Sequence, residues 1–393
     1  MRQLKCCSMF FYFKSHLPSW GPLRIDKRLM LLLFFLLCSA SASSEGKPNL
    51  AAPFKQMWFF NTDEMTRLSP IADGERVFLP LSGGRIVALS ISDSEQLWTS
   101  VPGGELTAPP LILDKKVYIS IRRGTAEAPD PGGVIRVIDR STGLILWAHE
   151  YDRAFVSNLV AEGDRIYAGS EDGHFYALRA KDGEVIWKAR TGEAVRGNAL
   201  ITEKAIYVGS DDGYLYVLNK ESGEQLWRFQ TGGRIVGRPA IGDEKIFFGS
   251  ADGNVYALDI RNGKKRWQVR TGAAVETMPL IYGDILIVAS YDNFVYGLSI
   301  RNGNRRWAER LPGRLSLDLI PGEDAVMVAP LASSEIYVIS ARDGKRINAI
   351  RTDSRKISEA KVVATPVLND NLLLIPTDRG LLAAKAIVDK AQQ

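Results

Sequence analysis

Short apolar runs separated by polar turn pairs recur along most of the chain. In the clearest unit, apolar runs at 166–168, 175–178 and 185–187 are separated by Asp172-Gly173 and then by Asp182-Gly183. Asp-Gly pairs suit tight hairpins because both residues tolerate positive φ. The pattern therefore predicts three antiparallel strands joined by two short turns.

This unit repeats, and a tryptophan in its last strand marks each copy. Five of the six intervals between these tryptophans are forty residues long. A fourth apolar run follows each tryptophan, as at 198–201 and 238–241. Four strands per forty residues make one blade of a propeller. We expect the large rings to pack neighbouring blades together; they are Trp58, Trp98, Trp147, Trp187, Trp227, Trp267 and Trp307.

The two ends of the chain are incomplete in complementary ways. The repeat begins with an isolated strand around Trp58 and ends with three strands, at 365–368, 372–375 and 381–384. An eighth turn-and-strand unit lies at 344–349, where the aromatic position falls on Ile347 or Asn348. Joining the two ends completes a blade and removes exposed sheet edges. The sequence predicts an all-β fold, an eight-bladed β-propeller of four-stranded antiparallel blades, closed by the N-terminal strand.

The one long interval, from Trp98 to Trp147, contains an insertion between Gly124 and Gly132. Because it alone breaks the repeat and its prolines lower the cost of ordering it, we expect a partner to bind there. The candidate interaction residues are Gly124, Glu127, Pro129, Asp130 and Pro131.

The N-terminal segment has the layout of an export signal. Basic residues at 24–28 precede an apolar run at 29–38, and Ala40-Ser41-Ala42 provides a small-x-small cleavage site. The run is too short for a membrane span, which needs about 20 residues. We therefore predict a signal sequence and upstream extension at 1–42, a linker at 43–54 and the propeller at 55–388.

A second interpretation makes Cys38 the lipidated cysteine of an outer-membrane lipoprotein. Leu37 argues against it, since that position normally holds a small residue. Both interpretations place the domain in the periplasm, with membrane association only through a lipid anchor or a partner.

Charge and cysteine content narrow the function classes. Residues 1–42 contain six basic and one acidic residue, which account for the whole net charge of +5. The remaining domain is neutral overall, which disfavours nucleic-acid binding. All three cysteines also lie in 1–42, so the domain after cleavage has no disulfide and no thiolate metal site.

Polar residues nine to eleven positions after a tryptophan should lie near the mouth of the central channel. Such residues could bind a small anion or a peptide; we favour the alternative that Arg196 and Arg238 pair with Glu276 and Asp318. The candidates are Asn158, Arg196, Asn198, Arg238, Glu276 and Asp318.

Aspartates recur at the same turn position in successive units, and we interpret them as residues that stabilise turns and not as calcium ligands. They are Asp172, Asp212, Asp252 and Asp292. No metal site, cofactor or catalytic residue is predicted.

The unit Tyr-x-Gly-Ser-x-Asp-Gly-x-x-Tyr-Ala-Leu, followed by Gly-x-x-x-Trp, resembles the PQQ-like repeat of bacterial propellers. It is clearest at 166–307 and covers 55–386. This family includes quinoprotein alcohol dehydrogenases and BamB, an eight-bladed accessory subunit of the outer-membrane β-barrel assembly machinery. The dehydrogenases hold their quinone against a disulfide of adjacent cysteines, which the domain lacks, and the chain is more similar to BamB in size.

The resemblance implies a monomeric, non-catalytic scaffold that binds a protein of the cell envelope, with the β-barrel assembly machinery as the named candidate. The alternative is a propeller that binds quinone or another small ligand. A third hypothesis, a carbohydrate or peptide receptor, would use aromatics at loop tips, with Tyr151, Phe155 and Tyr291 as candidates.

Overall fold

The computed structural model describes residues 49–124, 129–353 and 360–387. The chain divides into two compact units, Met1–Gly46 and Lys47–Gln393, and all described residues belong to the second. The predicted signal sequence and Cys38 lie outside the described residues. Among the residues described, no helix is long and apolar enough to cross a membrane.

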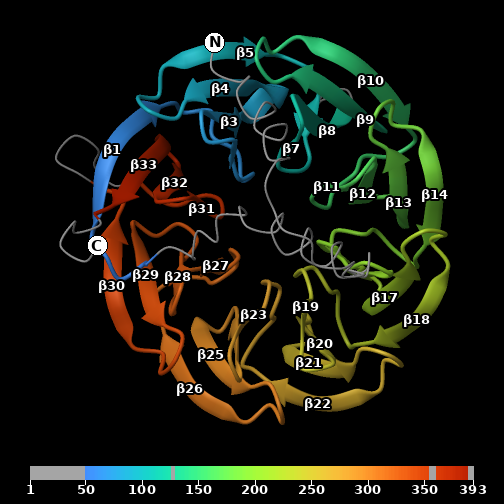
Figure 1. Cartoon of the computed structure of the whole chain (residues 1–393), viewed down its shortest axis with the longest axis vertical. Coiled ribbons are helices and arrows are strands. Elements are labelled where there is room, and N and C mark those ends of the chain that lie inside the picture. Colours follow the sequence, from blue (N-terminus) through green and yellow to red (C-terminus); the bar gives the residue numbers. More distant parts are fainter. Residues whose placement is uncertain (1–48, 125–128, 354–359, 388–393) are drawn as a thin grey trace, which may run out of the picture. The chain divides into compact units, whose positions relative to one another are not determined.

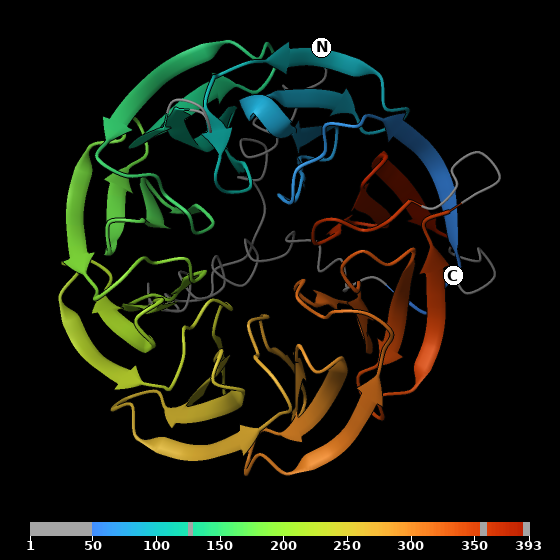
Figure 2. The same cartoon turned by 180° about the vertical axis from the view of Figure 1, so that it is seen from behind.

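Eight antiparallel sheets form a closed ring (Figures 1 and 2), as the repeat predicts. Blade 1 contains β2 (Ile71–Ala72), β3 (Arg76–Pro80), β4 (Ile86–Ser90) and β5 (Gln96–Ser100). Blade 2 contains β6 (Glu105–Leu106), β7 (Leu111–Leu113), β8 (Lys116–Gly124), β9 (Pro129–Asp139) and β10 (Ile145–Tyr151). Blade 3 contains β11 (Val160–Glu162), β12 (Arg165–Gly169), β13 (His174–Arg179) and β14 (Val185–Arg190). Blade 4 contains β15 (Leu200–Ile201), β16 (Ala205–Gly209), β17 (Tyr214–Asn219) and β18 (Gln225–Gln230).

The second half of the ring repeats this arrangement. Blade 5 contains β19 (Ala240–Gly242), β20 (Lys245–Gly249), β21 (Asn254–Asp259) and β22 (Lys265–Arg270). Blade 6 contains β23 (Leu280–Tyr282), β24 (Ile285–Ala289), β25 (Phe294–Ser299) and β26 (Arg305–Arg310). Blade 7 contains β27 (Ile320–Pro321), β28 (Ala325–Val328), β29 (Glu335–Ser340) and β30 (Arg346–Arg351). Blade 8 contains β31 (Val367–Asn369), β32 (Leu372–Thr377), β33 (Gly380–Ala386) and β1 (Phe54–Asn61).

Strand position in a blade follows from side-chain pattern. The two middle strands are buried on both faces, so they carry continuous apolar runs such as 175–178 in β13. The outer strand alternates instead: in β14 only Trp187 and Ala189 are buried. The core is therefore divided into layers that lie between neighbouring blades. In one such layer, Tyr167 and Trp187 of blade 3 pack against Ile206 and Tyr216 of blade 4.

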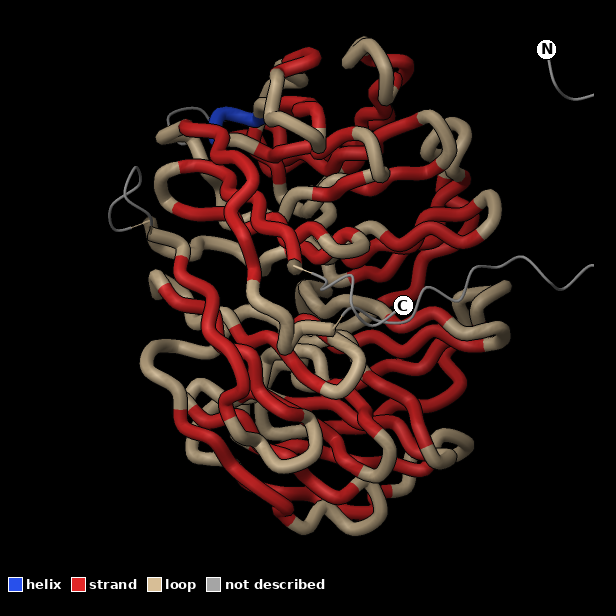
Figure 3. Tube along the Cα trace, turned by 60° about the vertical axis from the view of Figure 1, so that its left-hand side comes forward, coloured by secondary structure: helices blue, strands red, loops and turns tan. Residues whose placement is uncertain are grey.

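Figure 3 shows strands and loops throughout, with one short 3-10 turn, η1 (Ser82–Gly84), in the described part of the chain.

The tryptophans join one blade to the next. The indole Nε1 of Trp187 donates a hydrogen bond to the carbonyl of Lys220, in the turn before the outer strand of blade 4, at 3.2 Å. Gly223 in that same turn has φ of +74°, and a Cβ there would lie 2.5 Å from the Trp187 ring. The glycine is therefore required both for the turn and for the close approach of the ring.

The N-terminal strand closes the ring. β1 pairs antiparallel with β33, with Phe59 opposite Leu382, which confirms the predicted closure. At blade 7 it is Asn348, and not Ile347, that takes the tryptophan position, because it lies opposite Val338 as Trp187 lies opposite Ala177. The Asn348 amide donates hydrogen bonds to the carbonyls of Leu50 and Ala52, so the segment before β1 is also held.

The insertion in blade 2 lengthens a hairpin. β8 and β9 pair as far as Gly124 opposite Pro129, so both ends of the insertion continue the sheet. Asp130 and Pro131 belong to β9, whereas Glu127 lies outside the described residues.

Candidate functional site: the mouth face of the ring

One end of the ring gathers two kinds of connection. The crossovers from an outer strand to the next blade meet the hairpin tips between the two middle strands. In blade 3 the amide of Thr191 donates to the carbonyl of Gly173 at 2.7 Å, and the amide of Val195 donates to that of Ser170 at 3.0 Å. We call this end the mouth face; the hairpin of β8 and β9 projects from the same end.

A belt of alternating charges runs across the mouth face. Arg122 in blade 2 forms ion pairs with Glu105, at 2.7 Å, and with Glu171 of blade 3. Arg196 lies 3.8 Å from Glu171 and 2.9 Å from Asp211 of blade 4. Glu171 thus links Arg122 to Arg196, and Arg196 in turn links Glu171 to Asp211.

The belt continues across blades 5 and 6. Arg234 forms an ion pair with Glu276 at 2.7 Å, and the hydroxyl of Tyr291 donates to the same carboxylate at 2.6 Å. The guanidinium of Arg314 stacks 4.3 Å from the centre of the Tyr291 ring. Burial by itself raises the pKa of Glu276, but Arg234 and Tyr291 outweigh it and hold the pKa below its usual range. Burial, together with the adjacent Glu276, raises the pKa of Tyr291 to about 12.

The carboxylates of the belt lie beneath the arginines. The Glu276 side chain is 8% exposed, whereas that of its partner Arg234 is 51% exposed. Asp211 and Arg196 show the same relation, at 18% and 44%. Carboxylates that are less exposed than their partners therefore hold the guanidinium groups in fixed directions, which reduces the entropy that each arginine loses on binding a partner.

Four of the six predicted mouth residues take equivalent positions, two residues before the innermost strand of their blade. We call this set the channel ring: Asn158, Asn198, Arg238 and Asp318. The backbone amide of Asn158 donates to the side-chain oxygen of Asn198 at 3.0 Å, and that of Met278 donates to Asp318 at 2.7 Å. The Asp318 amide in turn donates to the Thr365 hydroxyl at 3.3 Å. Each of these side chains therefore accepts a backbone hydrogen bond from the blade before it.

Arg238 belongs to this channel ring and forms no ion pair within the described residues. Its guanidinium lies 4.0 Å from the sulfur of Met278. Burial lowers the pKa of Arg238, and burial raises that of Asp318, although Met278 and Arg238 both oppose the second shift. A groove of about 320 Å³ runs beside Arg238; most of its lining is apolar, as Leu280 and Pro321 illustrate.

The structure thus separates the predicted mouth residues into two levels, with Arg196 and Glu276 on the mouth face and the other four on the channel ring. The predicted pairing of Arg196 and Arg238 with Glu276 and Asp318 is wrong. Arg196 and Glu276 pair instead with Asp211 and Arg234, and neither Arg238 nor Asp318 forms an ion pair within the described residues. Sequence reasoning missed five residues of the belt. Glu171 and Asp211 follow the Gly-Ser pair of a hairpin tip, and Arg234 and Arg314 lie seven positions after a tryptophan; Arg122, on β8, follows neither pattern.

The recurrent aspartates bind the backbone. Asp252 accepts hydrogen bonds from the amides of Gly232 and Asn254 and from the Tyr256 hydroxyl. Asp212 has the equivalent three contacts one blade earlier. In the described ranges, no group of three or more His, Cys, Asp or Glu residues lies close enough to hold a metal ion.

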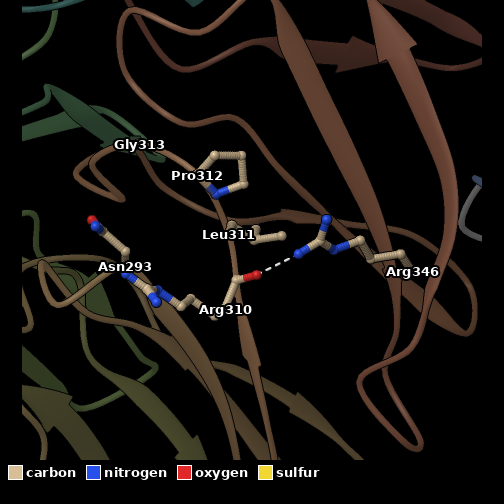
Figure 4. Close-up of a pocket in the computed structure, with 6 residues that line it drawn as sticks. All are labelled: Asn293, Arg310, Leu311, Pro312, Gly313 and Arg346. Atoms are coloured by element: carbon tan, nitrogen blue, oxygen red, sulfur yellow. Dashed lines mark hydrogen bonds between the residues drawn. The ribbon is translucent and has the colours of Figure 1, made fainter.

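The seam between blades 6 and 7 departs from the repeat. Leu311 and Pro312 replace the Thr-Gly pair of the crossovers after blades 3, 4 and 5. The threonine hydroxyl and the glycine amide that bond the neighbouring hairpins in those crossovers are therefore absent here. A pocket of about 400 Å³ lies at this seam (Figure 4), bordered by Arg310 and Arg346. Arg346 is committed to Glu309 at 2.6 Å and to the Arg310 carbonyl, whereas the Arg310 side chain points toward Asn293.

The aromatic receptor surface is not present as predicted. Phe155 is 1% exposed and packs edge-on against Tyr151, with ring centres 4.7 Å apart. The Tyr151 hydroxyl donates to the carbonyl of Gly183 at 2.6 Å. Tyr291 is occupied by Glu276 and Arg314.

Comparison with known proteins agrees with this geometry. The family described as outer membrane protein assembly factor BamB matches residues 131–274 and 234–390. The chain belongs to this family. No match was found among curated proteins.

Solved structures share the fold at low sequence identity. BamB from Moraxella catarrhalis is 16% identical with a TM-score of 0.69, covering 85% of this chain and all of that one. The computationally designed Ika8 protein is 17% identical with a TM-score of 0.70 and the same coverage. Quinohemoprotein alcohol dehydrogenase from Comamonas testosteroni is 11% identical with a TM-score of 0.68, covering 86% of this chain and 78% of that one.

Proposed function

We propose that this chain is an exported, non-catalytic scaffold whose mouth face binds a protein partner in the assembly of outer-membrane β-barrel proteins. The family description supports the process and, with it, a location in the periplasm or at the outer membrane. The observation that carries the binding role is that exposed arginines of the mouth face are held by carboxylates that are themselves largely covered.

Fixed arginines suit protein recognition. Arginine is enriched among residues that dominate interface energies, and its planar group can donate two hydrogen bonds to one carboxylate. Arg122 lies near the end of β8 in blade 2, and Arg196 and Arg234 lie in the crossovers that follow blades 3 and 4. The blade 2 hairpin projects beside Arg122, so one partner could contact both.

The non-catalytic part of the proposal rests on how the acidic groups are used. Glu171, Asp211 and Glu276 each hold an arginine, and Glu276 also accepts from Tyr291. The pKa of Glu276 is held below its usual range by Arg234 and Tyr291, which makes this carboxylate a weak proton acceptor. We infer that these three carboxylates position the arginines.

The test is recovery of envelope proteins with the full chain after chemical crosslinking in cells. We expect the wild type to recover components of the β-barrel assembly machinery. A variant with Arg122→Ala, Arg196→Ala and Arg234→Ala should recover at least tenfold less, because each truncation removes an interface donor.

The matched control is Arg165→Ala. Arg165 also forms an ion pair, with Glu221 at 2.7 Å, but it follows the turn at the opposite end of blade 3. It should recover as much partner as the wild type. Equal recovery by the triple variant, or no assembly component with the wild type, would refute the proposal.

A further inference from the structure

The outer wall of the ring carries a strong charge asymmetry. The outer strands of blades 5, 6 and 7, with the turns that lead into them, occupy 261–270, 301–310 and 342–351. These three segments, which we call the basic wall, contain thirteen basic and two acidic residues. The corresponding segments of the other five blades contain five basic and seven acidic residues. The basic residues therefore concentrate on three adjacent blades of a domain that is neutral overall.

The structure brings these charges together on one surface. β22, β26 and β30 follow one another on the circumference of the ring (Figure 1). All thirteen basic side chains belong to exposed residues. Seven of them form no ion pair within the described residues: Lys264, Lys265, Arg270, Arg301, Arg305, Arg310 and Arg342.

Protection of sheet edges explains only part of this pattern. An outer strand exposes unpaired backbone groups, and charged side chains prevent another strand from pairing with it. Charges of either sign serve that purpose, and the equivalent strands of blades 2 and 3 expose apolar residues there instead, including Leu144, Leu146 and Ile186. Edge protection alone does not explain why the charges on three successive blades are almost all positive. This excess of positive charge favours an anionic partner.

The composition of the basic wall favours a membrane over a protein as that partner. Stable protein interfaces have an apolar centre with aromatic or aliphatic anchors. Among the described residues, Ile347 is the only large apolar side chain strongly exposed on the basic wall. An anionic bilayer needs no shape match, because cations within a Debye length of about 8 Å of its surface are attracted.

We propose that the basic wall holds the ring edge-on against an anionic membrane surface, with its unpaired lysines and arginines near the phosphate-bearing lipid headgroups. This contact lies on the side of the ring, so the mouth face stays free. The inference goes beyond the scaffold function and does not depend on which protein partner is bound.

The experiment measures binding of the full chain to vesicles of phosphatidylcholine alone and with 30% phosphatidylglycerol, by sedimentation at low and at moderate salt. We expect at least tenfold tighter binding to the anionic vesicles at low salt, and loss of that preference as salt rises. A variant with Lys264→Gln, Lys265→Gln, Arg270→Gln, Arg305→Gln and Arg310→Gln should lose the preference.

The matched control removes five cations from the outer strands of other blades, with Lys55→Gln, Lys181→Gln, Lys188→Gln, Arg190→Gln and Arg228→Gln. It should keep most of the preference, although the net charge changes equally. Equal affinity for both vesicles, equal loss in the two variants, or binding of the wall to soluble polyglutamate but not to anionic vesicles would overturn the proposal. Since the vesicles contain no protein, failure here is distinct from failure to recover an assembly partner.

Discussion

At the scale of single residues, the hydrogen bonds of the recurrent aspartates explain why an aspartate occurs at the same turn position in successive blades. The sequence predicts that they stabilise turns, and the structure shows three donors on Asp252, one of them from the preceding crossover. Burial by itself raises the pKa of Asp252, but these hydrogen bonds outweigh it and lower the pKa. A group whose folded pKa is below its unfolded pKa stabilises the folded state above the unfolded value, near 4.

The substitution Asp252→Asn should lower the free energy of unfolding at pH 7 by about 1–3 kcal/mol, because one carboxylate oxygen becomes an amide that cannot accept. Urea denaturation measures this. The difference from the wild type should shrink as pH falls from about 4 through the folded pKa, since protonation removes the same interaction. Asp243→Asn is the control, because the Asp243 side chain is itself exposed and accepts from Lys245. A difference that persists unchanged at low pH would contradict the explanation.

The mouth residues mark the limit of residue-level prediction. Arg196 and Glu276, which the spacing after a tryptophan selected, lie on the mouth face, and their ion-pair partners come from adjacent blades. Arg196 pairs with Asp211, in a hairpin tip whose relation to the crossover is set by blade packing. Spacing along one chain segment cannot specify the rotation between two sheets.

At the scale of elements, the Gly-x-x-x-Trp pattern combines two roles that lie in different blades. Each glycine turn receives the tryptophan of the preceding blade, as Gly223 receives Trp187 and Gly263 receives Trp227. Copies of the pattern that are one repeat, or forty residues, apart in sequence therefore contact each other across the boundary between two blades.

Gly223→Ala should reduce the free energy of unfolding by about 2–5 kcal/mol, from a left-handed backbone and an overpacked ring. Gly163→Ala isolates the backbone contribution, because Gly163 has φ of +61° with nothing near its Cβ position. It should cost only about 1–2 kcal/mol. Thermal and urea unfolding measure both, and equal costs would show that the Trp187 contact is unimportant.

At the scale of the whole molecule, closure makes one cooperative ring from the two ends of the chain. Lys55 of β1 lies opposite Lys385 of β33, and both are exposed. Two lysines placed across a strand pair repel each other, so the apolar contacts of Trp58 and Phe59 and the hydrogen bonds of Asn348 must hold β1 in place.

A disulfide made by Lys55→Cys and Lys385→Cys should stabilise the oxidised ring over the reduced one. The gain should exceed that of His174→Cys with Arg190→Cys, an opposed pair within blade 3, by about 2–3 kcal/mol, because the loop it closes is far longer. Unfolding with and without reductant measures each gain. Failure of the terminal pair to oxidise would contradict the β1–β33 register.

The sequence by itself determined the repeat, the number of blades, the order of strands and the way the ring closes, because all of these follow from periodic apolar runs and turn residues. The sequence also determined how many basic and acidic residues each outer strand contains, because the residues of an outer strand lie at fixed sequence separations from its tryptophan. Only the tertiary structure decided which charges meet. The belt from Arg122 to Arg314, the backbone bonds of the channel ring and the continuity of the basic wall depend on contacts between blades, whose angles arise from packing of whole sheets.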